Sequence, residues 1–261
     1  MRGLRGKRVL ISGGSSGIGL AAAHRFRQEG ASVFIAGLDP AEVAQAVAGL
    51  RASADAGGPA GNVGGLACDV SQEGDVARLV AAADAALGGV DVLANNAGIA
   101  RRAAFLSMAV ADWDRILAVN LRGMFLVAQA VSAAMVRRGG GVIINMSSTN
   151  GIAGEEEYAH YNAAKAGVLL LTKTMAVELG QYGIRVNALC PGYISTPLNA
   201  AIAAGIGGDE FEREYARQRI PLGRTGQPEE VAAAYAFLAS EDASFIHGTG
   251  LVIDGGQLAV M

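Results

Sequence analysis

Tyr161 and Lys165 stand four residues apart in a segment whose pattern predicts a helix over residues 159–180, so both side chains project from one helix face. A phenol has a pKa near 10 and is a poor base at neutral pH. Lowering that pKa by two or three units requires roughly 3–4 kcal/mol of differential stabilisation of the phenolate. A nearby ammonium, held away from bulk water, acts in that direction. The spacing indicates a proton-transfer pair, and an ordinary helix-surface pair is the alternative.

Two further polar residues favour the proton-transfer interpretation. Ser148 follows a predicted strand, residues 142–146, and could hydrogen-bond a substrate oxygen beside the phenol. Asn120 lies inside a predicted helix, residues 111–137, where asparagine is a weak helix former. A buried amide at that position could fix a water and link Lys165 to solvent as a proton relay. The candidate catalytic residues are therefore Asn120, Ser148, Tyr161 and Lys165.

A glycine-rich turn, Gly13-x3-Gly17-x-Gly19, follows the first predicted strand and opens the first predicted helix. Glycines without a Cβ atom let the backbone turn tightly and approach a pyrophosphate, and the helix N-terminus supplies free N–H groups and positive dipole. The turn therefore predicts a dinucleotide site, with a strand-to-helix turn that binds nothing as the alternative.

The same turn also contains Gly13-x-Ser15-x-Gly17, the pattern of a hydrolase nucleophile elbow. A serine esterase with Ser15 as nucleophile and His247 as base is thus a rival hypothesis from another class of enzyme. The context disfavours it, because only fourteen residues precede Ser15 and the elbow needs an upstream loop that contributes an oxyanion N–H.

Short β-branched runs alternate with longer amphipathic ones, which is typical of a parallel sheet with crossover helices. Residues 54–64 resemble a surface loop, and the weakly patterned residues 197–220 are expected to form a mobile substrate lid. No repeat, linker or composition shift marks a second domain, so we predict one doubly wound α/β domain of the Rossmann type over residues 1–261, with a parallel seven-stranded sheet flanked by helices on both faces. Strands are predicted over residues 8–12, 32–36, 65–68, 90–94, 142–146, 184–190 and 250–253, and helices over 17–29, 40–52, 72–87, 111–137, 159–180 and 228–240.

Polar and glycine clusters fall at the carboxyl ends of the predicted strands, where ligands bind in sheets of this kind. Because these ends meet at one edge, their convergence is more informative than any single cluster. The clusters comprise residues 12–19, Asp39, Asp69, residues 95–98, residues 147–148 and residues 191–196.

Composition narrows the classes of function. Hydrophobic residues make up 51% and charged residues 17%, which excludes disorder, and a net charge of −3 offers no basic footprint for nucleic acid. Cys68 and Cys190 cannot form a metal-ligand cluster and are expected to be buried, inert thiols. The N-terminus lacks a signal peptide's apolar region, and no uninterrupted apolar stretch reaches the roughly 18 residues of a membrane span. We expect a soluble cytoplasmic protein without a metal that acts on a small molecule.

Together these motifs resemble the short-chain dehydrogenase/reductase family in its non-extended form, from the glycine turn to Gly255-Gly256. The thirteen-residue step from Ser148 to Tyr161 matches the family and selects Ser148 over Ser147. One departure is Ser12, where the family usually has threonine, and the hydroxyl is kept. The matching motifs are Gly13-x3-Gly17-Ile18-Gly19, Asp69-Val70, Asn95-Asn96-Ala97-Gly98, Asn120, Ser148, Tyr161-x3-Lys165 and Pro191-Gly192-x3-Thr196.

The resemblance implies an oxidoreductase that transfers a hydride between a nicotinamide cofactor and a secondary alcohol or ketone. Tyr161 would be the general acid/base, Lys165 would lower its pKa and hold the nicotinamide ribose, Ser148 would orient the substrate and Asn120 would complete the relay. Asp69 would bind the adenine amino group and Val70 its ring, while Asn95 would brace the sheet. The implied cofactor contacts are Gly13, Ser15, Ser16, Gly17, Ile18, Gly19, Leu38, Asp39, Asp69, Val70, Asn96, Ala97, Gly98, Tyr161, Lys165, Pro191, Gly192, Ile194 and Thr196.

NAD is favoured over NADP, because a 2′-phosphate calls for Arg or Lys and a free 2′-hydroxyl suits a carboxylate. Ser16 stands where NADP-dependent relatives often carry a basic residue, and Gly37-Leu38-Asp39 contains no arginine. NAD-dependent relatives usually place aspartate at the position of Gly37. Asp39, two residues later, could reach the ribose or could cap the helix that begins at Pro40.

The substrate pocket is expected after Ser148, around Arg101 and within residues 197–220. Candidate substrate contacts are Ser148, Asn150, Glu155 and Tyr161. In the run Glu155-Glu156-Glu157 a carboxylate could bind a polyhydroxy substrate, or the run could be a solvated charged surface. The triplet makes the chain similar to the family's sugar and polyol dehydrogenases.

Three other hypotheses about activity and assembly follow from the same resemblance. An NADPH-dependent 3-oxoacyl (acyl carrier protein) reductase is the alternative function, because those enzymes share the framework. A catalytically inactive NAD-binding protein is disfavoured, because all four catalytic positions are filled. The C-terminal residues 248–257 resemble a strand and glycine turn that pack at a subunit interface in relatives, which implies a homotetramer.

Overall fold

The computed structural model describes residues 1–55 and 61–260, over which seven parallel strands form one sheet in the order β3-β2-β1-β4-β5-β6-β7. The sequence neighbours β3 and β4 lie on opposite sides of β1, so the strand order reverses between β1 and β4. The predicted fold class is confirmed. The strands are β1 Arg8–Ser12, β2 Ser32–Gly37, β3 Val63–Ala67, β4 Val92–Asn95, β5 Gly141–Met146, β6 Ile184–Pro191 and β7 Gly250–Ile253.

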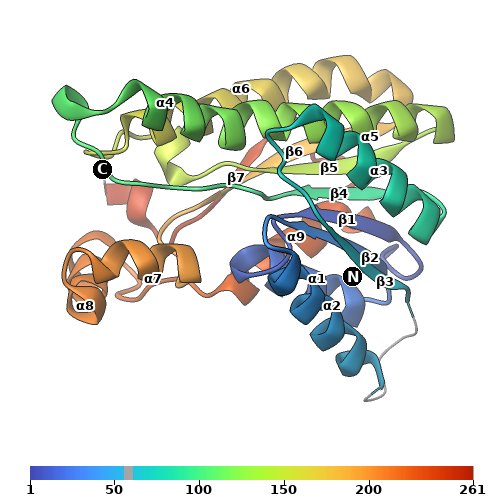
Figure 1. The fold of residues 1–261 in the computed structure, drawn as a ribbon, viewed down its shortest axis with the longest axis horizontal. Coiled ribbons are helices and arrows are strands. Elements are labelled where there is room, and N and C mark those ends of the chain that lie inside the picture. The colour runs from blue at the N-terminus through green and yellow to red at the C-terminus, as the bar shows by residue number, and fades with distance from the viewer. Residues whose placement is uncertain (56–60, 261) are drawn as a thin grey trace.

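Helices cover both faces of the sheet (Figure 1). On one face α1, α2 and α9 bury Phe26, Leu50 and Tyr235 against the strands, and on the other α3 and α5 bury Leu79 and Val131. The helices are α1 Gly17–Gln28, α2 Pro40–Asp55, α3 Glu73–Leu87, α4 Val110–Leu117, α5 Met124–Arg138, α6 Ala159–Leu179, α7 Pro197–Ala204, α8 Gly208–Arg219 and α9 Pro228–Ala239. Short helical segments are η1 Phe105–Ser107, η2 Ala118–Gly123, η3 Thr149–Gly151, η4 Gly180–Tyr182, η5 Glu241–Ala243 and η6 Gln257–Val260.

The predicted single helix over residues 111–137 is wrong in one respect. The π-helical segment η2 interrupts it between α4 and α5, and Asn120 lies in this wide turn with its side chain fully buried. π-helical turns inside α-helices occur frequently at functional sites.

The stretch Val110–Arg138 is long and apolar enough to cross a membrane by length and composition, although polar residues such as Asn120 and Arg122 interrupt it, and 44% of its apolar window is buried inside the fold. The buried residues of this stretch include Val127 and Val131, through which α5 packs into the core. A buried core helix of a soluble protein meets the same criteria of length and composition.

Residues 197–220 are more regular than the sequence indicates, because they form α7 and α8. Thr196 caps α7 by accepting a hydrogen bond from the Asn199 N–H at 3.3 Å, and Pro197 occupies the first turn. In α8 only Ala216 is buried, so the helix has almost no apolar periodicity for a sequence pattern to reveal.

The predicted loop over residues 54–64 is shorter at both ends, since α2 continues to Asp55 and β3 begins at Val63. Residues 56–60 of that prediction lie outside the described part of the chain.

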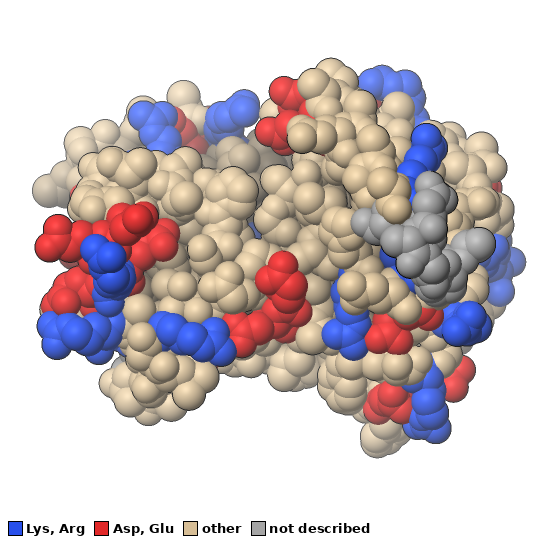
Figure 2. Space-filling model, turned by 90° about the horizontal axis from the view of Figure 1, so that it is seen from below, with Lys and Arg blue, Asp and Glu red and all other residues tan. Residues whose placement is uncertain are grey.

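Charged side chains on the face drawn in Figure 2 lie in mixed groups of both signs, separated by uncharged surface. No continuous basic stripe crosses this face, in line with the net charge of −3.

A buried polar network ties the central strands together below the edge at which ligands are expected. Ser12 on β1 donates to Asn95 Oδ1 on β4 at 3.1 Å, and Asn95 Nδ2 donates to the Met124 carbonyl at 2.8 Å and to Asn145 Oδ1 at 3.3 Å. Asn145 on β5 then donates to Thr172 Oγ1 on α6 at 3.0 Å. Asn95 therefore braces the sheet, and the network fixes β1, β4, β5 and α6 relative to one another.

Candidate active site

Lys165 lies under Tyr161 at the carboxyl end of β5. Its Nζ atom donates to the Met146 carbonyl at 2.9 Å and lies 5.4 Å from the centroid of the Tyr161 ring. The Lys165 side chain is buried, with 2% of the residue exposed. Ser148, two residues after β5, shares a hydrogen bond with the Tyr161 phenol. The structure thus brings the predicted phenol, ammonium and hydroxyl to one place.

Small side chains allow α6 to approach the end of β5. Ser147 Oγ donates to the Lys165 carbonyl at 2.8 Å. A Cβ atom on Gly151 would lie 2.7 Å from the same carbonyl oxygen, so only glycine lets η3 pack directly on α6. Ser147 is therefore a structural residue, and Ser148 is the serine that faces Tyr161.

The pKa values differ from the sequence expectation. Burial raises the pKa of Tyr161 to about 12, and the hydrogen bond with Ser148 offsets only part of that increase. Burial also lowers the pKa of Lys165 to about 8. The predicted lowering of the phenol pKa by Lys165 is therefore not found for the polypeptide alone, because burial is the largest influence on the pKa of both groups.

Asn120 is held by backbone groups. Its Oδ1 atom accepts from the Ile99 N–H at 3.1 Å, and its Nδ2 atom donates to the Ile99 and Ile116 carbonyls at 2.8 and 3.1 Å. A Cβ atom on Gly98 would lie 2.6 Å from Asn120 Oδ1 and 3.4 Å from Lys165 Nζ. Gly98 therefore separates the amide from the ammonium.

The glycine-rich turn forms an open cradle, which side chains at the glycine positions would fill. A Cβ atom on Gly19 would lie 1.9 Å from the Gly13 carbonyl oxygen, and Gly13 itself has a φ of +64°. Ser16, at the N-cap of α1, makes no capping hydrogen bond with its side chain, which leaves the first N–H groups of the helix for a ligand. Gly17 lies beside Thr196, since a Cβ atom there would be 3.6 Å from Thr196 Cβ. These features fit a dinucleotide.

The remaining predicted cofactor residues lie along the same edge. Leu38 is 65% exposed and offers apolar surface for a base, whereas Val70, which follows β3, is buried. Asn96 Nδ2 donates to the Gly13 carbonyl at 2.9 Å and holds the glycine turn beside Ala97. Asp69 Oδ1 accepts from Ser71, so part of its hydrogen-bonding capacity shapes the loop.

Asp39 serves as a helix cap. Its Oδ1 atom accepts from the backbone N–H of Ala41 at 2.7 Å and of Glu42 at 3.3 Å. Of the two roles that the sequence left open, the structure shows this one.

Ser15 and His247 do not form a catalytic pair. Ser15 Oγ contacts Glu42 Oε2 at 3.4 Å. His247 accepts from the Val186 N–H at 3.0 Å through Nδ1, and its Nε2 atom lies 2.9 Å from the Ala176 carbonyl. The geometry of a serine esterase is absent from the described residues.

A cleft of about 760 Å³ opens above the candidate catalytic residues, and Ser148, Asn150, Glu155 and Tyr161 all line it. Arg101, expected near the pocket, instead pairs with Asp112 at 2.7 Å, and its neighbour Arg102 lines the cleft. An aromatic and amide wall that includes Tyr158, Tyr193, Phe211, Tyr215 and Gln257 also lines the cleft. The sequence predicted a pocket within residues 197–220 but indicated none of these side chains.

This wall is held together across elements distant in sequence. The rings of Tyr193 and Tyr215 lie 5.0 Å apart, and Gln257 Nε2 donates to Tyr215 Oη at 2.8 Å. The signal that could have located it is the aromatic spacing in α8, where Phe211 and Tyr215 are four residues apart.

Neither cysteine belongs to a reactive or metal-binding group. Burial raises the pKa of both Cys68 and Cys190 to about 11. Among the described residues, no group of three or more His, Cys, Asp or Glu side chains could hold a metal ion.

A doubly wound sheet with a dinucleotide cradle and a Tyr-Lys-Ser group at its edge defines a nicotinamide-dependent oxidoreductase. The family described as "Enoyl-(Acyl carrier protein) reductase" matches residues 13–257. The chain is 41% identical to 3-oxoacyl-[acyl-carrier-protein] reductase FabG of Thermotoga maritima, over 97% of this chain and 98% of the relative. It is also 41% identical to D-threitol dehydrogenase of Mycolicibacterium smegmatis, over 97% and 93%. The crystal structure of levodione reductase superposes with a TM-score of 0.93 at 35% identity and covers 100% of both chains.

The chain therefore belongs to the short-chain dehydrogenase/reductase family and is an oxidoreductase acting on CH–OH groups with NAD or NADP.

The buried Lys165 ammonium should make stability depend on pH. Its pKa of about 8 lies below the ordinary value of 10.5, so the unfolded chain binds more protons between these values and stability rises with pH there. A Lys165→Met variant lacks this contribution. From pH 7 to pH 10 the wild type should therefore gain about 2–3 kcal/mol in free energy of unfolding relative to this variant, measured by urea denaturation.

Lys173→Met, on the exposed side of the same helix α6, is the matched control. A stability difference between wild type and Lys165→Met that stays constant within about 0.5 kcal/mol across this pH range would show that the ammonium is not desolvated.

Proposed function

We propose that this oxidoreductase interconverts a polyol, sugar or related hydroxy compound and its ketone, with NAD as the preferred cofactor and Tyr161 as the proton-transferring residue. The observation that carries the proposal is the meeting of Tyr161, Ser148 and the buried Lys165 at the base of a cleft rich in hydrogen-bonding side chains. Asn120 completes this catalytic group.

The cofactor, when bound, would accept or supply the hydride. In reduction Tyr161 donates its phenol proton to the substrate oxygen, and a pKa of about 12 keeps that proton in place at neutral pH. In oxidation the phenolate takes the hydroxyl proton of the alcohol. The Lys165 ammonium, 5.4 Å from the ring centroid, stabilises the phenolate, which is the base in oxidation and is formed in reduction, and Ser148 holds the substrate oxygen beside the phenol.

A hydroxylated substrate suits the polar groups of the cleft. Asn150, Glu155 and Gln257 offer amide and carboxylate groups, while Tyr193 and Tyr215 offer both an apolar face and a hydroxyl. The similarity to D-threitol dehydrogenase agrees with this class. The 41% identity to a 3-oxoacyl-[acyl-carrier-protein] reductase favours the second candidate, a 3-oxoacyl reductase that uses NADPH.

The preference for NAD rests on the charges near the end of β2. Residues 13–19 and 37–42 contain no lysine or arginine, so a 2′-phosphate would find no cation in these segments. Glu42 places a carboxylate 3.4 Å from the Ser15 hydroxyl, where it would repel a phosphate. Gly37 cannot gain a side chain without displacing Ser15, because a Cβ atom there would lie 2.5 Å from Ser15 Oγ.

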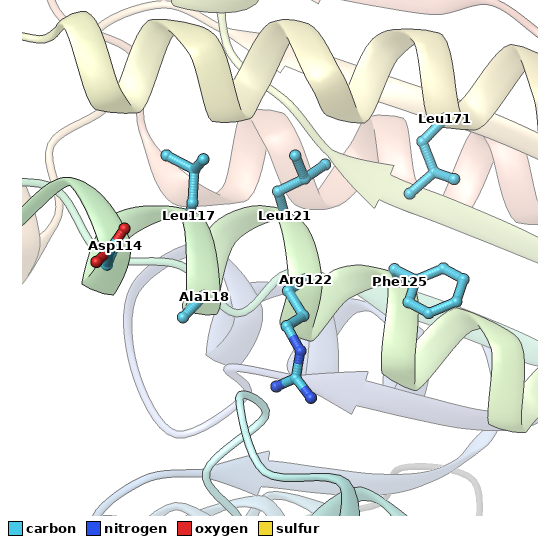
Figure 3. A pocket seen from close by; sticks show the side chains of 7 residues that line it. All are labelled: Asp114, Leu117, Ala118, Leu121, Arg122, Phe125 and Leu171. Atoms are coloured by element: carbon cyan, nitrogen blue, oxygen red, sulfur yellow. The ribbon is translucent and has the colours of Figure 1, made fainter.

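A homotetramer agrees with the apolar outer face of α4, α5 and α6. Leu117, Leu121, Phe125 and Leu171 line a groove of about 540 Å³ between these helices (Figure 3). Leu170 and Val177 on α6 are 68% and 85% exposed. Apolar surface of this kind marks a protein interface. A single sedimenting species at the monomer mass of 26.5 kDa would contradict the proposed assembly.

The two unpaired cysteines agree with a cytoplasmic location.

A substrate panel tests the function. D-threitol, other polyols, sugars, cyclic alcohols and a 3-hydroxyacyl thioester are each followed at the nicotinamide absorbance with NAD and NADP in parallel. We expect the highest kcat/KM with a polyol or sugar and NAD. Equal or better rates with NADP would overturn the cofactor preference, activity confined to the thioester would establish the second candidate, and binding of NAD without turnover of any compound would indicate an inactive protein.

Tyr161→Phe removes the transferred proton and keeps the ring. Turnover should fall by about 10²–10⁴-fold, the usual contribution of a positioned general acid/base, while cofactor affinity measured by calorimetry stays within about threefold. Tyr182→Phe, in the exposed η4 segment, is the control and should retain full turnover. Near-normal turnover in Tyr161→Phe would refute the assignment.

A further inference from the structure

The Tyr215 hydroxyl has a fixed position in the wall of the cleft. The Tyr215 ring packs against those of Tyr193 and Phe211, with centroids 5.0 and 5.9 Å away. Gln257 Nε2 donates to Tyr215 Oη at 2.8 Å, which occupies one lone pair of the phenol oxygen. Within residues 1–55 and 61–260, no acceptor takes the phenol proton. The cleft therefore contains a preorganised hydrogen-bond donor.

Glu155 adds a hydrogen-bond acceptor to the same cleft. Its Oε2 atom accepts from Asn150 Nδ2 at 2.8 Å, and the backbone N–H of Asn150 donates to Ser148 Oγ at 3.2 Å. Asn162 Nδ2 donates to the Glu155 backbone carbonyl at 2.9 Å. The Oε1 atom has no hydrogen-bond partner in the described part of the chain. An ionised carboxylate only accepts, so Glu155 keeps one oxygen available for a donor.

The loop that carries Glu155 is held in a strained conformation. Glu157 has a φ of +65°, which is unfavourable for a residue with a side chain. Its carbonyl accepts from the Ala103 N–H at 2.8 Å, and its carboxylate pairs with Arg102. Backbone strain that neighbouring contacts maintain is concentrated at ligand-binding sites, and here it sets the position of Glu155.

Glu155 acts on both the aromatic wall and the reacting end of the cleft. Burial raises the pKa of Tyr215 and of Tyr161 to about 12, and the negative charge of Glu155 acts in the same direction on each phenol. The carboxylate is therefore close to both groups, and one small molecule can contact Tyr161, Glu155 and Tyr215 together.

The charges around the cleft favour a neutral ligand group beside Glu155. Ion pairs with Glu157 and Arg217 neutralise Arg102 and Glu214. Of the other three charged residues, Glu155 is half-buried, whereas Glu156 and Arg219 are exposed, so the charge of Glu155 acts most strongly inside the cleft. The charged residues that line the cleft are Arg102, Glu155, Glu156, Glu214 and Arg219.

We propose that Glu155 and Tyr215 form a second recognition point, which binds a substrate hydroxyl other than the one that is oxidised. A hydroxyl group matches the pair, because it can donate to Glu155 Oε1 and accept from the Tyr215 phenol at the same time. This inference rests on the proposed function and narrows its substrate to compounds with at least two hydroxyl groups.

Other groups at this point are bound less well. A methylene or methyl group leaves both the donor and the acceptor without a partner. A carboxylate can accept from Tyr215 but is repelled by Glu155, and the carbonyl of a 3-hydroxyacyl thioester can only accept. The pair therefore selects polyols and sugars against hydroxy acids and acyl thioesters.

The first experiment compares matched substrates at the nicotinamide absorbance. The probes are the panel polyol with the highest kcat/KM, its monodeoxy analogues, and the hydroxy acid in which a carboxylate replaces one terminal CH₂OH. For D-threitol these are 1,2,3-butanetriol, 1,2,4-butanetriol and D-threonate. We expect kcat/KM to fall at least about tenfold for the analogue that lacks the recognised hydroxyl, the effect of a lost hydrogen bond to a charged group, and also for the hydroxy acid.

The second experiment repeats these measurements in two variants. In Tyr215→Phe the penalty for the missing hydroxyl should shrink about three- to tenfold, the range of one net hydrogen bond. In Glu155→Gln the ratio of kcat/KM for the hydroxy acid to that for the polyol should rise about tenfold, because the repelling charge is gone. NAD affinity within about threefold of wild type verifies the fold. Glu178→Gln and Tyr182→Phe, both exposed and outside the cleft, are the matched controls and should change neither ratio.

The outcomes separate this inference from the proposed function. Equal kcat/KM, within about twofold, for the polyol and all its monodeoxy analogues would overturn the inference alone, as would a single-hydroxyl alcohol that exceeds every polyol. A wild-type preference for the hydroxy acid would overturn it in favour of a carboxylate bound by Arg219. Turnover confined to the thioester, or of no compound, would overturn both the inference and the proposed function.

Discussion

The desolvated ammonium of Lys165 is the constraint on which the rest of the site depends. Among the described residues it has no carboxylate partner, and its Nζ atom is held by the Met146 carbonyl at 2.9 Å. Burial of a charge with so little compensation is costly, and it lowers the pKa of Lys165 to about 8. In the proposed mechanism this charge acts beside the ring of Tyr161, and perturbed buried groups of this kind cluster at functional sites.

The sheet supplies the rigidity that keeps this unfavourable group in place. The hydrogen bonds from Ser12 through Asn95 and Asn145 to Thr172 cross β1, β4, β5 and α6 within the core. The side-chain amides of Asn95 and Asn145 in this network are buried and hydrogen-bonded, so displacing one strand would leave several polar groups without partners. Movement of α6 relative to β5, which would release Lys165, is opposed by the whole network. The Ser148–Asn150–Glu155 contacts continue the same principle up to the cleft.

The sequence was sufficient for the fold and for the group of side chains that meet at the end of β5, because both rest on strong local rules. Buried parallel strands appear as apolar runs, and ligand-binding residues follow their carboxyl ends. It was insufficient where tertiary packing decides. The π-helical turn at Asn120 depends on side-chain hydrogen bonds to Ile99, and α8 has too few apolar residues to show a period. The direction of the Tyr161 pKa was also mistaken, because spacing reveals a neighbouring charge but not the burial that opposes it.

Direct titration of Lys165 tests the central claim of this account, that its ammonium is desolvated beneath Tyr161. The chain contains three lysines, Lys7, Lys165 and Lys173, so carbon-13 labelling at Cε gives a simple spectrum. We expect one resonance that titrates with a midpoint of about 8 and that is missing in the Lys165→Met variant. A Lys165 resonance that titrates above about 10, as an ordinary solvated lysine does, would contradict it.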